Sequence, residues 1–320
     1  MRRIVSTFVG GVLALVLAGC SPIQDEPLKI GAIAWDGYAP LFVAERIGVF
    51  DARSIKLVTM PSSTDVLRLL ETGLIDAGAV TLGEALTAIS HGTKLRIILI
   101  MDYSNGADVL VARPKFRTIA SLKGKPIARE PTVIAAVMLS SALAASGLST
   151  TDVKVREIYA SDQLKAFSDG KVDAAVSYTP YSKALLAAGG KVLFDSSAIP
   201  GTINDVLVVR EDAFVSKAKS LLELVRGFYK AETFMQIQPK AARGYVAAKT
   251  GTSPESVAET LAGLRLPTAA ESMEMLAGEP SKIDLLAQRL AKTMVNSGLL
   301  PADFQFAAMG DVRDLNRAME

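Results

Sequence analysis

Two short motifs each occur twice along the chain at one offset, and this repetition constrains the fold more than any other feature. The segment G-L-I-D-A at residues 73–77 matches G-K-V-D-A at residues 170–174, and D-V-L-V-A-R at residues 108–113 matches D-V-L-V-V-R at residues 205–210. The offset is 97 residues in both cases, since 170 − 73 and 205 − 108 give the same difference. Several matches at one spacing indicate a duplicated unit. The sequence therefore predicts two α/β lobes that share one strand–helix–turn–strand unit.

Runs rich in β-branched residues alternate with helical stretches in the first third of the chain. This alternation is typical of parallel sheets covered by helices. One helix is expected to begin near Pro40, because proline in the first helical turn loses no needed hydrogen bond. We further expect strands at residues 28–34, 55–60, 77–80 and 94–101, and helices at residues 64–72 and 83–90.

The two D-V-L-V-x-R segments bracket the middle of the chain, and we expect each to cross between the lobes. Lobe one would then be discontinuous and comprise residues 28–111 and 205–320, and lobe two would comprise residues 112–204. Two crossing strands allow the lobes to hinge around a cleft. The predicted fold class is α/β, with two doubly wound lobes and C-terminal helices packed on lobe one. The longest of these helices is expected at residues 214–236.

The start of the chain has the pattern of an export signal. Two arginines precede an apolar run at residues 4–18, which is shorter than the roughly 20 residues of a membrane span and typical of a secretory signal. The run ends in L-A-G-C, which resembles a bacterial lipobox and implies lipidation of Cys20. We expect a signal peptide at residues 1–19, a lipidated tether at residues 20–27 and a location in the cell envelope. An ordinary secretory signal is the alternative. The sequence does not decide whether the lipid anchor lies in the inner or the outer membrane.

Composition excludes several classes of protein. The formal net charge of +2 argues against nucleic-acid binding, which needs a basic face. One cysteine and one histidine exclude a disulfide framework, CxxC zinc sites and multi-histidine metal sites. Since neither a GxSxG elbow nor a P-loop is present, we expect no metal, no cofactor and no catalytic residue. His91 is expected to cap a helix, and Asp76 and Asp173 are expected to bond nearby turn backbone.

A longer stretch connects the chain to a known family. Residues 35–50, W-D-G-Y-A-P-L-F-V-A-E-R-I-G-V-F, resemble the opening of the nitrate/sulfonate/taurine-type solute-binding proteins of ABC importers. D-Y-S-N-G at residues 102–106, S-L-K-G-K at residues 121–125 and the two G-x-[IV]-D-A segments resemble later landmarks of that family, in order. The resemblance implies a periplasmic-binding-protein type II fold. It also implies a monomer that closes on a small solute, catalyses no reaction and docks on an ABC permease and ATPase complex.

The carboxyl ends of the predicted strands are the expected binding site, because ligands of open parallel sheets bind there. Two lobes that face one another would bring these ends into one cleft. The expected ligand-binding residues of lobe one are Trp35, Asp36, Tyr38, Ser62, Thr81, Tyr103, Ser104 and Asn105, with Asp205 at the return crossing. Those of lobe two are Glu130, Thr132, Tyr178 and Thr179.

Two classes of solute fit these residues. Helix N-termini at the strand ends suit an anion such as sulfonate or nitrate. Carboxylates in the cleft would oppose an anion, and the aromatic residues suit a planar nitrogen-containing solute such as a vitamin precursor. A solute-sensing receptor is an alternative to import. An enzyme similar to the thiamine-pyrimidine synthases is a weaker alternative. Those enzymes share this fold family, but they carry a cysteine-rich motif that this chain lacks.

Overall fold

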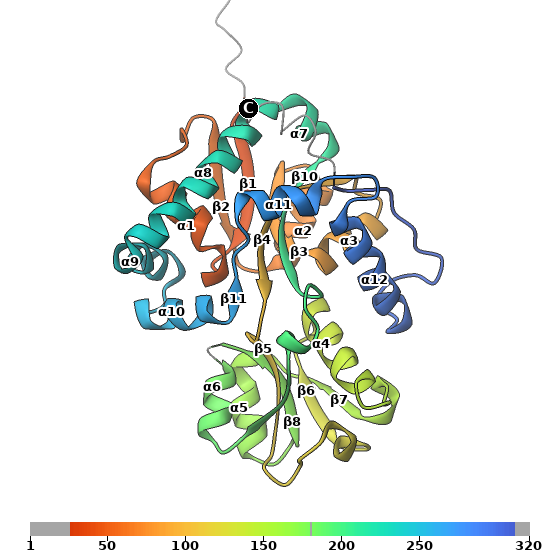
Figure 1. Cartoon of the computed structure of the whole chain (residues 1–320). Helices are drawn as coiled ribbons and strands as arrows, with labels where there is room; N and C mark the ends of the chain where they lie inside the picture. Colours follow the sequence, from red (N-terminus) through yellow and green to blue (C-terminus); the bar gives the residue numbers. More distant parts are fainter. Residues whose placement is uncertain (1–25, 180, 311–320) are drawn as a thin grey trace, which may run out of the picture.

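The chain folds into two lobes, each with its own β-sheet, in a computed structural model that describes residues 26–179 and 181–310 (Figure 1). The predicted signal peptide, Cys20 and most of the tether lie outside the described residues. Within them, no helix is both long enough and apolar enough to cross a membrane.

Lobe one, the upper lobe of Figure 1, is a six-stranded sheet flanked by helices. Its strands lie in the order β11-β4-β10-β3-β1-β2, and β10 runs antiparallel to β3 and β4. The elements before the crossing to lobe two are β1 (Leu28–Ile33), η1 (Asp36–Tyr38), α1 (Ala39–Ile47), β2 (Ile55–Met60), α2 (Ser63–Glu71), β3 (Ala77–Thr81), α3 (Leu82–Ser90) and β4 (Leu95–Ser104). The strands that return later are β10 (Asn204–Arg210) and β11 (Leu264–Arg265).

Lobe two, the lower lobe of Figure 1, repeats this arrangement in a five-stranded sheet of order β7-β6-β8-β5-β9. Its antiparallel strand β5 lies between β8 and β9, as β10 lies between β3 and β4. The shared order confirms the duplicated unit. The elements are β5 (Asp108–Ala112), η2 (Ile119–Leu122), β6 (Pro126–Arg129), α4 (Val133–Ala144), η3 (Thr150–Asp152), β7 (Lys154–Glu157), α5 (Ala160–Ser168), β8 (Ala174–Tyr178), α6 (Tyr181–Ala187), β9 (Lys191–Asp195) and η4 (Ser196–Ala198).

The chain passes between the lobes at two short segments. One comprises residues 105–107, between β4 and β5, and the other comprises residues 199–203, between η4 and β10. The whole of β5 pairs with strands of lobe two, so the expected crossing at residues 111 and 112 is wrong and the first boundary lies before Asp108. The repeated D-V-L-V strands are the matching antiparallel strands of the two sheets, and each belongs to one lobe.

The repeated motifs have a physical reason in both lobes. Arg210 at the end of β10 donates from its guanidinium to the carbonyl of Leu70 near the end of α2, at 3.0 Å. Arg113 after β5 donates in the same way to the carbonyl of Phe167 near the end of α5. Gly73 then adopts a left-handed backbone with φ of 73°, which glycine accepts without strain. A Cβ there would also lie 2.7 Å from the Arg210 guanidinium, so the motif needs glycine as well as arginine.

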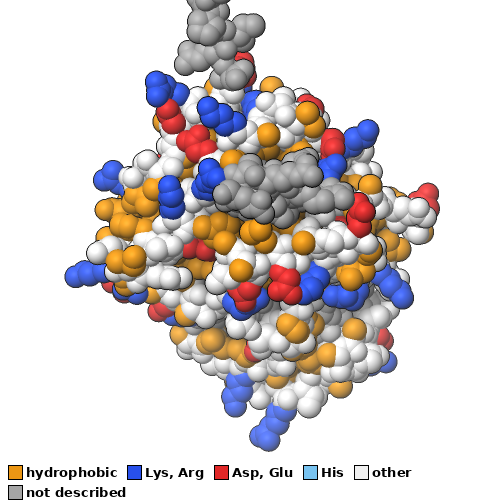
Figure 2. Space-filling view, turned by 45° about the horizontal axis from the view of Figure 1, so that its top comes forward, with side chains coloured by type: hydrophobic (Ala, Val, Ile, Leu, Met, Phe, Trp, Pro, Cys, Tyr) orange, Lys and Arg blue, Asp and Glu red, His pale blue; other side chains and the backbone are white. Residues whose placement is uncertain are grey.

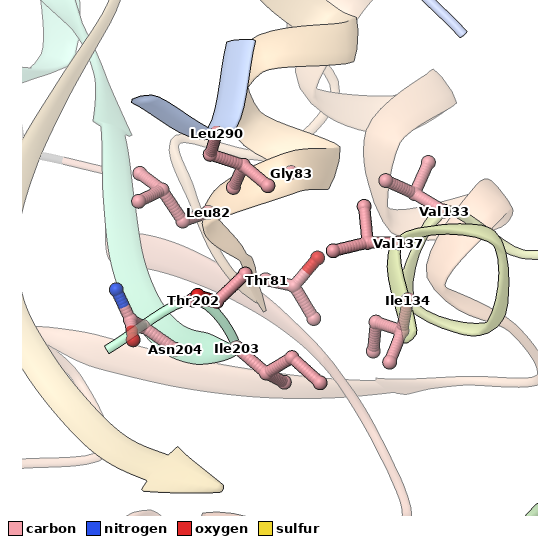
Figure 3. Close-up of a pocket in the computed structure, with 10 residues that line it drawn as sticks. All are labelled: Thr81, Leu82, Gly83, Val133, Ile134, Val137, Thr202, Ile203, Asn204 and Leu290. Carbon is pink, nitrogen blue, oxygen red and sulfur yellow. The ribbon is translucent and has the colours of Figure 1, made fainter. Parts of the chain in front are cut away.

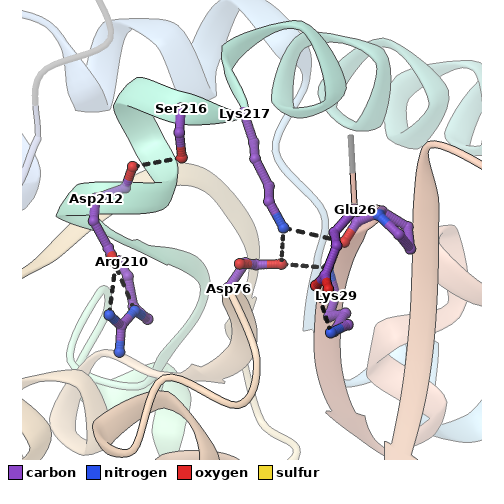
Figure 4. A network of polar contacts seen from close by, with 8 residues as sticks. Glu26, Lys29, Asp76, Arg210, Asp212, Ser216 and Lys217 are labelled. Carbon is purple, nitrogen blue, oxygen red and sulfur yellow. Dashed lines mark hydrogen bonds and ion pairs between the residues drawn. The ribbon is translucent and has the colours of Figure 1, made fainter. Parts of the chain in front are cut away.

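Asp76 joins three segments of lobe one that are far apart in sequence (Figure 4). Its Oδ2 accepts from the backbone N–H of Lys29 on β1 and from the Lys217 ammonium, both at 2.7 Å. The expected bond to nearby turn backbone is therefore wrong for Asp76. Its counterpart Asp173 pairs instead with the Lys115 ammonium at 2.9 Å. The position that Lys29 holds in β1 is taken in β6 by Pro126, which accepts from the backbone N–H of Asp173. Proline has no N–H, so it cannot donate to Asp173 as Lys29 donates to Asp76.

The helices after β10 pack on lobe one. The expected single helix at residues 214–236 is instead two helices, broken at Lys217, where φ is −119° and ψ is 26°. α8 and α9 cover α1, and α12 packs against α3. Ser253 caps α10, as predicted. The elements are α7 (Glu211–Ser216), α8 (Ala218–Ile237), α9 (Pro239–Thr250), α10 (Pro254–Ala262), α11 (Ala269–Leu276) and α12 (Lys282–Asn296).

Candidate functional site

Aromatic side chains from both lobes meet between the two sheets. Trp35 follows β1 of lobe one, and its ring contacts that of Tyr178, the last residue of β8 in lobe two, at 6.0 Å between centroids and 86° between planes. Tyr181 at the start of α6 extends the cluster, since its ring lies 5.5 Å from that of Tyr178. Edge-to-face pairs of this kind are favourable. The cluster therefore spans the cleft and places a flat apolar surface on each of its walls.

A pair of buried carboxyl groups lies next to this aromatic cluster. Asp102 on β4 and Asp205 on β10 are directly opposite across the antiparallel ladder, and both are buried. The Trp35 side chain donates a hydrogen bond to Asp205. Glu84 at the start of α3 and the buried Tyr38 hydroxyl complete this chamber. Three carboxyl groups thus lie around one phenol and one indole at the edge of lobe one.

Burial and mutual repulsion shift the pKa values in this chamber upward. Burial, followed by the charges of Glu84 and Asp108, raises the pKa of Asp205 to about 8. Burial and the neighbouring Asp205 also raise the pKa of Asp102 well above its ordinary value. The Tyr38 pKa rises for the same reasons, first from burial and then from the adjacent acids. A charged carboxylate here is unfavourable unless a cation or a proton neutralises it.

A further buried carboxyl group, that of Asp108, lies at the boundary between the lobes, because Asp108 is the first residue of β5. Burial raises its pKa to about 6, although a hydrogen bond from the Ser104 hydroxyl at 2.6 Å partly offsets this effect. Ser104 also bonds the Ser196 hydroxyl at 2.7 Å, and Ser196 accepts from the backbone N–H of Gly106 at 2.7 Å. This network connects residues 104–108 to η4. It therefore joins the two crossing segments at the hinge.

Lobe two contributes one further carboxylate to the cleft. Glu130, after β6, accepts from the backbone N–H of Ala160 at 2.9 Å, and so lies at the N-terminus of α5. The Tyr178 hydroxyl donates to Glu130, and burial followed by the Glu130 charge raises the pKa of this tyrosine. Both walls of the cleft thus pair an aromatic ring with a carboxyl group.

The lobes are in close contact beside this region, around a small pocket (Figure 3). Its volume of about 10 Å³ is close to the space of one water molecule. A Cβ on Gly83 of α3 would lie 2.7 Å from Cγ1 of Val133 on α4, which shows how closely the helices of the two lobes approach. The described form is therefore closed. The pocket is lined by Thr81, Leu82, Gly83, Val133, Ile134, Val137, Thr202, Ile203, Asn204 and Leu290.

A second contact between the lobes lies on the side of α6 and α10. Lys183 on α6 forms an ion pair with Glu259 on α10. The backbone N–H of Asn105 donates to the carbonyl of Gly263 at 2.9 Å, so the first crossing segment is also attached to the end of α10. These contacts hold the cleft closed on the side away from α3 and α4.

The structure brings six of the expected site residues to the cleft between the lobes. Trp35, Tyr38 and Asp205 lie in the acidic chamber, Glu130 and Tyr178 form the facing wall, and Thr81 lines the pocket beside it. Thr81 also makes a capping box with Glu84, since each accepts a hydrogen bond from the other's backbone N–H.

The other expected site residues have structural contacts elsewhere. Asp36 accepts from the Thr252 hydroxyl at 3.1 Å, which fixes η1 to the turn after α9. Tyr103 points to the opposite face of the sheet from its neighbour Asp102, and the Arg265 guanidinium lies 5.0 Å from its ring. Ser62 and Thr132 cap α2 and α4, Ser104 bonds Asp108, Asn105 belongs to the crossing segment, and Thr179 directly follows β8.

The sequence prediction of the site did not include Glu84, Asp108 or the Ser196 contact. The sequence could have predicted the position of Glu84. T-x-x-E at residues 81–84 is the pattern of a capping box, which places the glutamate beside the end of β3. His91, in contrast, ends α3 as expected, and its Nδ1 lies 2.8 Å from Glu71.

Comparisons with known proteins agree on the fold. The model of the NMT1-like family matches residues 21–250. A putative aliphatic sulfonates-binding protein of Escherichia coli is 26% identical over 310 residues, which cover 94% of each chain. The periplasmic aliphatic sulphonate binding protein SsuA of Escherichia coli superposes with a TM-score of 0.72 at 21% identity, over 86% of this chain and 94% of that chain.

One structural neighbour is an enzyme. The desulfurization enzyme DSZB has a TM-score of 0.67 at 16% identity, over 91% of this chain and 98% of that chain. The fold is therefore that of the periplasmic binding proteins, as predicted, and it is shared by binding proteins and by at least one enzyme.

Proposed function

The chain belongs to the NMT1-like family, and from this premise we propose that it is the solute-binding component of an ABC importer. In this role it captures a small solute outside the cytoplasm and delivers it to a permease and ATPase complex. The similar protein of Escherichia coli carries the name of a sulfonates-binding protein, and it matches this chain over nearly its whole length.

The observation that carries the proposal is the meeting of Trp35 and Tyr178 across the cleft. Trp35, Tyr178 and Glu130 lie at the carboxyl ends of the parallel strands β1, β8 and β6, where open α/β sheets bind ligands, and Asp205 lies beside Trp35 on β10. A solute that contacts both walls stabilises the closed form over the open form, because it keeps its contacts with only one lobe when the lobes separate. The closed protein then presents both lobes together to the permease.

Binding without reaction fits the residues of the cleft better than catalysis does. The only cysteine of the chain is Cys20, outside the described residues, and His91 lies at the end of α3 beside Glu71. The side chains that surround the cleft are carboxyl groups, phenols, an indole and an amide. A sensing receptor would use the same cleft, so it is separated from an importer by uptake: loss of solute uptake on gene deletion supports import, and normal uptake contradicts it.

We also propose that Cys20 attaches the protein to the membrane through lipid. The apolar run at residues 4–18 followed by L-A-G-C supports this assignment. Substitution Cys20→Ala, or treatment with an inhibitor of the lipoprotein signal peptidase, should leave an unprocessed precursor of higher mass. A band of unchanged size under both treatments would contradict lipidation.

The binding proposal is tested with a solute panel and one pair of variants. Thermal shift across sulfonates, nitrate, pyrimidines and small amines identifies a solute, and isothermal calorimetry then measures its affinity. Trp35→Ala should weaken that affinity at least about tenfold, because it removes the ring that closes the cleft. Tyr159→Ala removes an aromatic ring that is 64% exposed outside the cluster and should leave the affinity unchanged. Equal affinities of all three proteins would remove Trp35 from the site, and a panel without any binding solute would contradict the function.

A further inference from the structure

We propose that the solute of this cleft is a nitrogenous organic cation, held between the acidic pair Asp102–Asp205 and the aromatic rings of Trp35 and Tyr178. The inference rests on the proposed function, since it assumes that this cleft binds a solute, and it adds the charge and chemical class of that solute.

Five carboxyl groups lie around the aromatic rings and the boundary between the lobes. Glu84, Asp102, Asp108 and Asp205 lie on the side of lobe one and the boundary, and Glu130 lies on the side of lobe two. Among the described residues, no lysine or arginine forms an ion pair with any of these five carboxyl groups, although many surface carboxylates have such partners. A buried acidic cluster without a cation is costly to keep charged. A bound cation would supply the missing opposite charge.

Two buried polar side chains, one on β4 and one at the start of β10, have hydrogen-bonding atoms without a protein partner. Asp102, which is 2% exposed, shares a hydrogen bond with Asp205, but its Oδ2 receives no hydrogen bond from a protein N–H or hydroxyl. Both amide atoms of Asn204, which is 1% exposed, are unpartnered. Asn204 lines the pocket between the lobes (Figure 3) and precedes Asp205 on β10. Buried polar groups are nearly always satisfied. Asp102 and Asp205 share one proton, and their remaining carboxyl oxygens can accept hydrogen bonds from a solute that carries N–H donors.

The surroundings favour an organic cation over a metal ion. In the described part of the chain, no group of three or more histidine, cysteine, aspartate or glutamate side chains could hold a metal. Three aromatic rings follow one another along the cleft: the ring centroids of Trp35 and Tyr178 are 6.0 Å apart, and those of Tyr178 and Tyr181 are 5.5 Å apart. Aromatic faces attract ammonium, guanidinium and protonated heterocycles through their negative π-surface. The cleft thus offers carboxyl oxygens that accept hydrogen bonds on one side and aromatic faces that attract cations on the other.

The attraction is local to the cleft and does not come from the whole surface. Acidic and basic side chains are interspersed over the face seen in Figure 2, without a large region of one sign. The formal net charge of the chain is only +2. A cationic solute is therefore selected inside the cleft, after the lobes separate enough to part the Trp35 and Tyr178 rings and admit it.

The test compares three probes that share one ring and differ in charge: benzamidine, benzamide and benzenesulfonate. Calorimetry on the full chain should give benzamidine at least about tenfold higher affinity than benzamide, and no measurable binding of benzenesulfonate. The single tryptophan of the chain is Trp35, so its fluorescence should change with benzamidine and report binding in the cleft itself.

Matched variants then locate the preference for a cation. Asp205→Asn should reduce the benzamidine preference about tenfold or more, and Asp102→Asn provides the same test if the first variant does not fold. Asp169→Asn, which removes an exposed carboxylate paired with Lys165, should leave the preference unchanged.

Several outcomes would overturn the assignment. Tighter binding of benzenesulfonate than of benzamidine, equal binding of benzamidine and benzamide, or no binding of any of the three would each do so. Failure of the transport function is a separate result, because it appears as a solute panel without any binding partner or as normal uptake in a deletion strain.

Discussion

Replacement of Asp205 by asparagine should make the unliganded protein more stable, and more so at high pH. Asparagine keeps an oxygen that can accept the hydrogen bond from Trp35, and it has nearly the same shape. The substitution removes the negative charge that burial and the charges of Glu84 and Asp108 disfavour. The same site also faces Asp102 across the ladder and the Tyr38 hydroxyl, so no neighbouring cation is lost with it.

The magnitude follows from the difference between the folded and unfolded pKa of Asp205. The folded value of about 8 lies above the ordinary value of 3.8, so the folded chain binds this proton more tightly than the unfolded chain. The wild-type protein therefore loses stability as the pH rises between these two values, by about 1.4 kcal/mol per pH unit, and keeps that loss at higher pH. The full interval sets an upper limit of roughly 5–6 kcal/mol, and because Asp102 shares the same proton we expect a gain of about 2–4 kcal/mol.

Urea denaturation of both proteins without solute, at about pH 5 and about pH 9, measures this gain. The difference in unfolding free energy should be at most about 1.5 kcal/mol at the lower pH, which is only just above the ordinary pKa of 3.8, and largest at the higher pH. Asp169→Asn is the control, because the ion pair with Lys165 lowers the pKa of Asp169 and its removal should act slightly in the opposite direction. A stability difference between Asp205→Asn and wild type that does not grow with pH would refute the reasoning.

Three further substitutions test other contacts. Arg210→Ala should destabilise lobe one by about 1 kcal/mol in urea denaturation, because it removes the charged one of the two donors to the Leu70 carbonyl and leaves only the backbone N–H of Gly73, and an unchanged midpoint would contradict this role. Gly83→Ala should keep lobe one folded but disfavour closure against Val133, so X-ray scattering should show a larger radius of gyration, and an identical profile would count against the closed form. Lys183→Met should change solute affinity by less than about fivefold, because the ion pair with Glu259 is half exposed, and a larger loss would show that this contact governs closure.

Much of the fold could be predicted because it depends on short-range patterns. The alternation of strands and helices, the proline at the start of α1 and the glycines after α2 and α5 are local signals. The repeat at one offset predicted the duplicated sheet. The crossing of β5 could not be placed correctly, because a D-V-L-V strand looks the same whether it spans two lobes or pairs within one.

The candidate site was predictable only in part, since side-chain contacts join residues far apart in sequence. Strand ends predicted the neighbourhood of Trp35, Tyr178 and Asp205 correctly in space. The alternation of side chains along β4 places Asp102 and Tyr103 on opposite faces, and the sequence motif at residues 102–106 does not indicate which one faces the cleft. Asp36 was predicted to bind ligand because it follows the first strand. Its hydrogen bond from Thr252 joins residues that are 216 positions apart in sequence, and no local pattern predicts it.

If one solute contacts both lobes in this cleft, hydrogen–deuterium exchange with and without the bound solute reveals it most directly. We expect slower exchange in the bound protein at two places together: residues 35–38 after β1 and residues 178–179 at the end of β8. Protection at only one of these segments, or at neither of them while the solute is bound, would contradict the account.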